Sequence, residues 1–444
     1  MRAKFASFGR QAVAAIAPAA IALASCAVLV AGTPAMAKDT APAKPTNSPE
    51  FSKVAGPFQK QLVDLDGKKA KLSADELKAQ AAALLPQLAT IEASVKNPLD
   101  RIIYGQWQYT VGGMAGDAAV SSKGLQNMLD SGQLPADKAL LVTTMLGQTA
   151  YTAKDYAGAI KLLAPVMSNA AVQDVVPEML AESYASSGQP KQGLDALKSA
   201  IAARKAANGS IPEDWYNRGK LIAYNAKLSA ESVEWGLLLV QAFPSQLNWL
   251  GATELVLFNG ANFTGQEELD VYRLMDQTGS LKLEPKYTDR KYVAYVQLID
   301  PRRYPGEAVR IAEQGIATGA LKAEDTFVKD ALAQARPRLA TDKASLPGLA
   351  KEANAAPSGK VALAAADTYL SYGESAMADQ LYTMALAKGG VDADHDRVLT
   401  RLGIAQIGEG KYADAKATLA KVSGVRAPIA QAWSIYAYQK AAGK

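Results

Sequence analysis

The pattern of apolar and polar positions recurs along this chain. In residues 401–419, RLGIAQIGEGKYADAKATL, a small residue follows an apolar one, and a second small residue stands twelve positions later. Three upstream segments, 145–163, 179–197 and 364–382, share this arrangement. Large apolar residues follow the second small residue by four positions, and steps of four and three lie on one helical face. Each segment therefore predicts two consecutive helices joined by a turn.

The small residues predict where the two helices of a pair come closest. Two antiparallel helices approach closely only where their side chains are small, and larger side chains then fill the groove towards the next pair. The four predicted points of approach are Gly147 with Ala159, Ala181 with Gly193, Ala366 with Ala378, and Gly403 with Ala415. Polar turn residues separate the helices in each case.

The spacing between these units resembles that of the tetratricopeptide repeat (TPR) family. Gly147 and Ala181 are 34 residues apart, and Ala366 and Gly403 are 37 apart. The resemblance implies an all-α fold, an α-solenoid of antiparallel helix pairs wound into a right-handed superhelix. Most units lack the family's Trp in the first helix and its closing Pro. A further pair is predicted at 292–315.

The pattern divides the chain into six predicted segments. They are a signal peptide (1–37), a disordered Pro-rich linker (38–57), an N-terminal helical region (58–139), TPR-like repeats that are irregular in the middle (140–336), a possible hinge punctuated by prolines (337–358), and C-terminal TPR-like repeats (359–444). Within the N-terminal helical region, 73–95 predicts one helix that begins with a capping box of Ser73 and Glu76. A following helix is expected to break at Gly112, Gly113 and Gly116.

The N-terminal segment predicts export. A basic start precedes an Ala-rich apolar run, and the small-x-small triplet ends at Ala37. Cleavage there leaves a periplasmic or secreted protein without a membrane span. Two alternatives remain open: lipidation of Cys26, which ends a lipoprotein-like LASC box, or retention of the run as an uncleaved anchor.

Charge and composition exclude several classes of function. Arg2, Lys4 and Arg10 lie in the leader, and the rest of the chain carries 45 basic against 43 acidic residues, so nucleic acid is not an expected partner. The chain holds one Cys and one His, His395, which argues against a zinc centre. We find no nucleophile or phosphate-loop motif. The acidic residues of 392–396 are interpreted as the N-terminus of a helix rather than a calcium loop. We therefore expect no cofactor, no metal and no enzymatic activity.

Three sets of residues are candidates for binding. The first lines the predicted concave surface: Thr144, Gln148, Tyr151, Glu178, Glu182, Asp367 and Arg397. The second is a basic and aromatic patch: Arg290, Lys291, Tyr295, Arg302, Arg303 and Tyr304. The third is a concentration of aromatic residues in 215–249, which either pack in the core or line a groove: Trp215, Tyr216, Tyr224, Trp235, Phe243 and Trp249. The Lys/Asn/Arg clamp of some family members is absent, since Thr144, Gln148, Met179 and Glu182 stand at its positions.

Our leading hypothesis from the sequence is an exported, non-enzymatic scaffold that binds a protein partner in the cell envelope through its concave surface. The alternative is a carbohydrate-binding component of polysaccharide export or envelope assembly. That alternative requires the tyrosines and arginines of 286–310 to share a groove with the tryptophans of 215–249.

Overall fold

The computed structural model describes residues 46–260 and 262–443. The chain divides into two units, Met1–Asn47 and Ser48–Lys444, and the fold described below is that of the second unit. The predicted signal peptide and its cleavage or lipidation sites lie outside the described residues.

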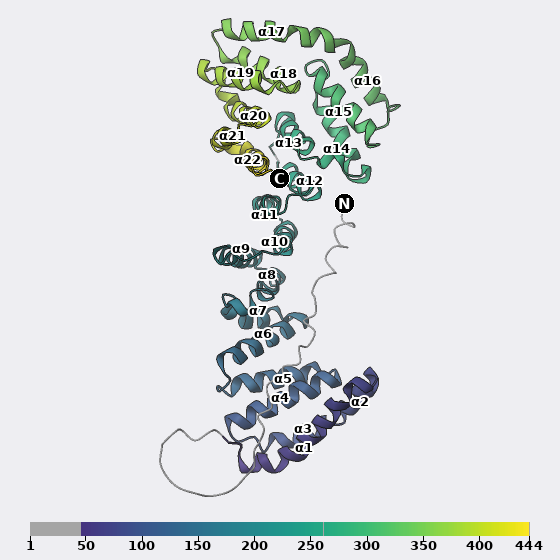
Figure 1. The fold of residues 1–444 in the computed structure, drawn as a ribbon, viewed down its shortest axis with the longest axis vertical. Coiled ribbons are helices and arrows are strands. Elements are labelled where there is room, and N and C mark those ends of the chain that lie inside the picture. Colours follow the sequence, from purple (N-terminus) through teal and green to yellow (C-terminus); the bar gives the residue numbers. More distant parts are fainter. Residues whose placement is uncertain (1–45, 261, 444) are drawn as a thin grey trace. The chain divides into compact units, whose positions relative to one another are not determined.

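The described part of the chain is built from α-helices, short 3-10 turns and loops, with no strand (Figure 1). The helices are α1 (Pro49–Lys68), α2 (Ala74–Ala82), α3 (Leu85–Glu92), α4 (Pro98–Ala115), α5 (Ala118–Asp130), α6 (Ala136–Thr152), α7 (Tyr156–Leu163), α8 (Val176–Ser186), α9 (Pro190–Ala206), α10 (Glu213–Asn225), α11 (Ser229–Ala242), α12 (Gln246–Asn259), α13 (Gly265–Gln277), α14 (Pro285–Leu298), α15 (Pro305–Ala317), α16 (Thr326–Ala335), α17 (Leu339–Ala355), α18 (Gly359–Ser371), α19 (Ser375–Lys388), α20 (His395–Gly408), α21 (Tyr412–Leu419) and α22 (Ala427–Ala441). The predicted all-α class is confirmed.

Consecutive helices pack in pairs, and the small residues lie where the pairs touch. A Cβ atom added to Gly147 would overlap the side chain of Leu163, and one added to Gly403 would overlap Leu419. In both pairs the contacted leucine lies sixteen positions after the glycine. The close approach of two helices therefore explains the recurring pattern.

The same interval reveals a helix pair in the irregular middle of the chain. Gly219 on α10 lies against the ring of Trp235 on α11, sixteen positions later, and a Cβ there would overlap the indole. The indole thus fills the place that leucine takes in the regular units. The pair predicted at 292–315 is also present as α14 and α15, with Val296 and Ala308 buried between them.

The N-terminal boundary of the helical array differs from the prediction. The linker was expected to run to residue 57, but α1 begins at Pro49. The backbone N–H and the hydroxyl of Ser48 donate to the carboxylate of Asp100 (3.0 and 2.7 Å), and Phe51 stacks on Trp107. Pro directly after a Ser cap favours the start of a helix. The prediction missed this start because Pro49 was counted with the other prolines of the linker.

Two further helix boundaries differ from the prediction, one because of a proline and one because of glycines. The helix predicted over 73–95 is divided into α2 and α3, because Pro86 lacks the N–H that an uninterrupted helix requires. Its predicted capping box is confirmed, with the N–H of Ser73 donating to Glu76 at 2.8 Å. Helix α4 continues through the first two glycines of its cluster and ends at Ala115, where it is capped by Gly116, whose φ of 69° is left-handed. Most of the proposed hinge at 337–358 is occupied by α17, which contains Pro347.

The C-terminal helices pack back onto the middle of the chain. Helix α22 contacts α11, α12 and α13 (Figure 1), and one hydrophobic cluster includes side chains from both regions. The indole N–H of Trp433 donates to the carbonyl of Asp270 (3.1 Å), and the amide of Gln439 donates to the carbonyl of Val240 (2.7 Å). No helix among residues 46–260 and 262–443 is long and apolar enough to cross a bilayer.

Candidate functional site

The first helices of successive pairs carry a row of polar and aromatic side chains, which we call the first-helix face. On α6, α8 and α10 it includes Tyr151, Glu178, Glu182 and Arg218. The guanidinium of Arg218 donates to Glu178 (3.1 and 2.8 Å) and to Glu182 (3.0 Å). All four side chains are half-buried. The structure therefore brings three of the predicted concave-surface residues together around an arginine that sequence analysis did not identify.

Electrostatics link these four side chains. Burial alone would lower the pKa of Arg218, but its hydrogen bond to Glu178 and the charges of both glutamates raise that pKa above its usual value. Burial raises the pKa of Tyr151, and the neighbouring charge of Glu182 adds to this effect. The two glutamates and one arginine leave a net negative charge at this end of the face.

The first-helix face continues over α10, α12 and α14. The ring of Tyr224 lies 6.2 Å from that of Phe258, and these side chains are 42% and 74% exposed. At the side of α12 that faces α14, Glu254 pairs with Lys291 (2.7 Å). Side chains from three successive first helices thus meet in one row. An aromatic ring as exposed as that of Phe258 is the main apolar feature of this row.

The two remaining α6 candidates are less available. Thr144 is buried, and its hydroxyl donates to the carbonyl of Leu140 one turn earlier (2.9 Å). Gln148 is half-buried on the same helix.

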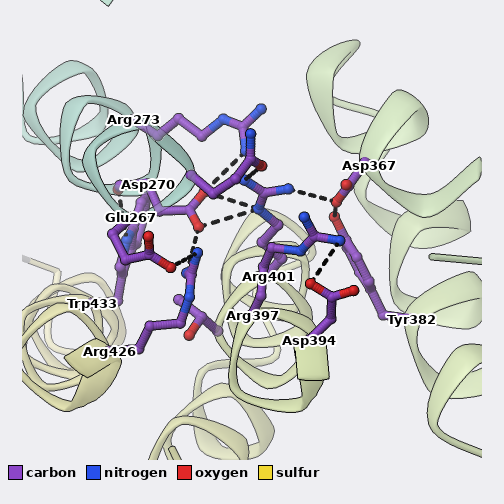
Figure 2. Close-up of polar contacts among 12 residues, drawn as sticks. Glu267, Asp270, Arg273, Asp367, Tyr382, Asp394, Arg397, Arg401, Arg426 and Trp433 are labelled. Carbon is purple, nitrogen blue, oxygen red and sulfur yellow. Dashed lines mark hydrogen bonds and ion pairs between the residues drawn. The ribbon is translucent and has the colours of Figure 1, made fainter. Parts of the chain in front are cut away.

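A second group of polar residues lies inside the protein, and we call it the buried charge network (Figure 2). Its members are Glu267, Asp270, Arg273, Glu307, Asp367, Arg401 and Arg426. Asp270 on α13 accepts hydrogen bonds from Arg401 (3.0 and 3.1 Å), Arg426 (2.8 Å) and Arg273 (3.0 Å). Its burial favours the neutral acid, but the three arginines outweigh this effect and lower its pKa to about 2.

Arg401 joins Asp270 to a second buried carboxylate. Its guanidinium also donates to Asp367 on α18 (2.8 Å), which accepts a further bond from the hydroxyl of Tyr382 (2.7 Å). The side chain of Asp367 is fully buried, so it lies in the core and not on a surface open to a partner. Arg397, one helical turn before Arg401, is mostly buried and pairs with Asp394 (3.3 Å).

Two further ion pairs complete the network. Arg273 holds Glu307 on α15 through two bonds (2.9 and 2.6 Å), and the hydroxyl of Tyr295 donates to the same carboxylate (2.8 Å). Arg426 pairs with Glu267 at 2.8 Å. The network therefore ties α13 to α15, α18, α20 and the segment before α22. Its charged groups pair with each other, and we interpret the network as a structural element that holds these distant helices together.

The basic and aromatic patch predicted at 290–304 does not form one surface. Its two tyrosines, Tyr295 and Tyr304, are buried. Its four cations have separate surroundings: Lys291 pairs with Glu254, Arg302 donates to Gln334, and Arg290 is exposed. The fourth, Arg303, lies over the Tyr304 ring and 3.5 Å from Asp367. Tyr295 on α14 lies against α15, where its hydroxyl donates to Glu307, and Tyr304, directly before α15, has its hydroxyl 3.5 Å from Asp367 on α18. The tryptophans of 215–249, namely Trp215, Trp235 and Trp249, are buried as well.

Sequence reasoning missed the buried charge network and Phe258, whereas Tyr224 was among the aromatic candidates of 215–249. The pattern did place Arg401 directly before the Leu-Gly pair of a repeat unit, where a charged residue is flanked by core positions. Its partner Asp270 is 131 residues away in the sequence, and a local sequence pattern cannot predict a contact over that separation. Phe258 stands in the apolar run LVLF, which reads as core in a sequence. His395 is exposed, and no group of His, Cys, Asp and Glu in the described ranges is arranged to hold a metal ion.

Comparisons with known proteins add little to these observations. No protein-family model matches the chain, and no curated protein matches it. Among solved structures, Naa15/Naa10 bound to HypK-THB is 14% identical, with 88% of this chain and 72% of that chain covered and a TM-score of 0.34. The TPR2AB domain of yeast Sti1 in a complex with pHSP90 is 12% identical, with 69% and 97% covered and a TM-score of 0.23. Because these TM-scores are low, the assignment rests on this chain's own helix packing. The protein is an all-α helical-repeat protein with TPR-like helix pairs.

Proposed function

We propose that this protein is a non-enzymatic scaffold that binds a protein partner through the first-helix face. The observation that carries the proposal is the exposed aromatic pair of Tyr224 and Phe258, aligned with half-buried charged side chains on neighbouring first helices. Covering a solvent-exposed aromatic ring with a partner removes apolar surface from water, which favours binding. Aromatic residues and arginine are also typical of binding hot spots. The first helices hold these groups rigidly, which lowers the entropic cost of binding.

The carbohydrate alternative has less support than the protein-binding one. Sugar binding by stacking needs aromatic rings that are open to solvent. Of the rings on which that hypothesis depended, Tyr287 is 44% exposed, and the others are buried: Trp215, Trp235, Trp249, Tyr292, Tyr295 and Tyr304. Tyr224 and Phe258 remain exposed, but they lie among charged groups that suit a peptide at least as well.

The location of the scaffold is proposed on sequence grounds. The leader and the triplet ending at Ala37 support an envelope protein that is periplasmic or secreted, with lipidation of Cys26 as the alternative. N-terminal sequencing of the protein from its native cells distinguishes these outcomes. A start at Lys38 supports cleavage, and a lipid-bearing Cys26 supports a membrane-tethered scaffold.

Site-specific crosslinking tests the binding face. A photoreactive amino acid is placed at Tyr151 or Phe258 on first helices, and at Lys161 or Gln241 on second helices as matched exposed controls. We expect irradiation of intact cells to give discrete crosslinked protein bands from the first two positions only. Bands from the control positions alone would contradict the proposal, and so would their absence from all four.

A further inference from the structure

Helix α12 carries a stripe of residues that is largely open to solvent, in which Glu254 pairs with Lys291 and Phe258 contacts the ring of Tyr224. Leu247, Gly251, Glu254 and Phe258 follow each other at intervals of four, three and four residues, which places them on one helical face. Leu247 and Phe258 are 53% and 74% exposed, and no neighbouring atom of the described residues lies within 4 Å of a Cβ built on Gly251. We call these four residues the α12 stripe.

Gly251 differs from the glycines at helix crossings. A Cβ at Gly147, Gly219 or Gly403 would overlap a packed side chain, which explains those glycines. No contact in the described part of the chain requires Gly251, although glycine lowers helix stability relative to alanine. Glycine also allows another backbone to approach closely. Other open helical glycines occur, but none lies on a helix that carries an exposed aromatic side chain: Gly56, Gly67 and Gly348.

Helix α10 carries a cation one turn before Tyr224, whose ring contacts Phe258 of the stripe. Lys220 lies one turn before Tyr224, on the same side of α10, and its ammonium donates to the side chain of Asn217 (3.0 Å). Lys220 makes no ion pair with a carboxylate in residues 46–260 or 262–443, whereas Lys291 on α14 is paired with Glu254. Burial lowers the pKa of Lys220, since it disfavours the charged form. The charge of Glu213 already opposes that effect, and a carboxylate supplied by a ligand would offset it further.

We propose that the α12 stripe, with Lys220 and Tyr224, binds a peptide segment of a protein partner in which an acidic side chain stands close to an aromatic or branched aliphatic one. This inference rests on the proposed function and names the chemistry of the partner. The apolar side chain covers the rings of Tyr224 and Phe258, the carboxylate pairs with Lys220, and the peptide backbone passes over Gly251.

The dimensions fit a short extended segment. Residues one turn apart on a helix have Cβ atoms about 5–6 Å apart, which sets the distance between the sites for the acidic and apolar side chains. An extended peptide advances about 3.3 Å per residue, so the two side chains are neighbours or next-but-one neighbours in the ligand. Gly251 lies seven residues before Phe258, or about 10 Å along α12, which three extended residues span.

Selection of random linear peptides displayed on phage, with the full chain as bait, tests this directly. We expect the enriched peptides to pair Asp or Glu with Phe, Tyr, Trp, Leu or Ile within two positions. One such synthetic peptide should bind Phe258→Ser at least about tenfold more weakly, since the covered ring is lost. Enrichment of basic or wholly polar sequences, or of none, overturns the inference.

Two further variants separate recognition from stability. Lys220→Met should weaken binding of the acidic peptide, but not of its Asn or Gln counterpart, which isolates the charge pair. Gly251→Gln should block the approach of the peptide backbone, whereas Gly56→Gln on α1, an equally open helical position, should leave binding unchanged. Equal loss for both peptides in Lys220→Met would contradict the assigned carboxylate site. If Phe258 crosslinks a partner in cells but the selected peptides lack acids, the proposed function stands and this inference fails.

Discussion

The helix pair is used in two ways in this protein. Through α6–α10, each pair packs on the pairs next to it in sequence, and the hydrophobic clusters draw on neighbouring helices. Through α11–α22, the chain returns on itself: α22 contacts α11, α12 and α13, and Arg401 reaches Asp270 across 131 residues. The first region is a local array and the second is a closed unit.

The difference shows that repeat architecture alone does not decide how stability is distributed. In a stacked array, stability is approximately a sum of terms from each unit and its neighbours. A long-range closure adds contacts that form only when distant helices come together, so the closed unit is expected to unfold as one body. In the α6–α10 array the charged groups that meet between first helices are half-buried, whereas the closed unit carries charges that are fully buried.

Among these predictions, removal of Arg401 should cause the largest loss of stability in the closed unit, with the local array unchanged. Arg401→Met leaves Asp367 buried with the loss of its 2.8 Å ion pair and takes one of three arginines from Asp270. Breaking a buried pair typically costs about 3–5 kcal/mol. Urea unfolding followed by hydrogen exchange should show lower protection in α11–α13 and α20–α22 together, with α4–α9 unchanged.

The matched control is Lys123→Met, which removes the exposed pair with Glu92 and should cost at most about 1 kcal/mol. Loss of protection confined to α20 in the Arg401 variant would mean that the two ends of the closed unit are not coupled.

Acid should loosen the closed unit before the local array. The pKa of Asp270 falls from 3.8 to about 2 on folding, so its contribution of about 2 kcal/mol is fully present above pH 4 and is lost as the pH falls towards 2. The charges of neighbouring arginines also lower the pKa values of Glu307 and Asp367. Calorimetric melts between pH 7 and pH 2 should show a Tm that falls steeply below pH 4. Asp270→Asn should flatten that fall, and an unchanged slope would assign the acid sensitivity elsewhere.

Overpacking of equivalent small residues should sharpen the contrast. Ala159 and Ala415 occupy the same place in their pairs and are both fully buried, so Ala159→Leu and Ala415→Leu should each cost about 1–3 kcal/mol. Hydrogen exchange should show damage limited to α6–α9 in the first variant, and damage that reaches α11–α13 in the second. Lys416→Leu, on the exposed side of α21, is the control and should cost little. Equal urea midpoints for Ala415→Leu and Lys416→Leu would contradict the close helix approach.

The smallest expected effect is a gain in stability. Gly251→Ala adds a methyl group that meets no neighbouring atom within 4 Å in residues 46–260 and 262–443, and it should stabilise the protein by up to about 1 kcal/mol. Gly219→Ala makes the same chemical change against the ring of Trp235 and should destabilise it. Thermal melts of the two variants should therefore move in opposite directions. Shifts of the same sign would show that backbone propensity, and not packing, sets the response at both positions.

The candidate site shows where prediction from sequence is effective. Tyr151, Glu178 and Glu182 were selected because first-helix positions recur at fixed intervals, and the structure places them together around Arg218. Asp367 was selected by the same rule and is buried, because in its part of the chain the first helix is covered by Arg401 and its partners. The rule identifies the side of a helix, and it does not report what covers that side.

The sequence by itself determined the helix pairs, their small crossing residues and the capping box at Ser73, because these depend on spacings of a few residues within one or two helices. Only the tertiary structure decided that α22 returns to α11–α13, that Asp270 collects three arginines, and that Phe258 is left in water. Those outcomes depend on residues far apart in the chain, such as Gln439 and Val240 at a separation of 199. A local sequence pattern does not specify which distant helix will pack against a given helix face. That long-range packing determines whether a charged or aromatic side chain becomes buried.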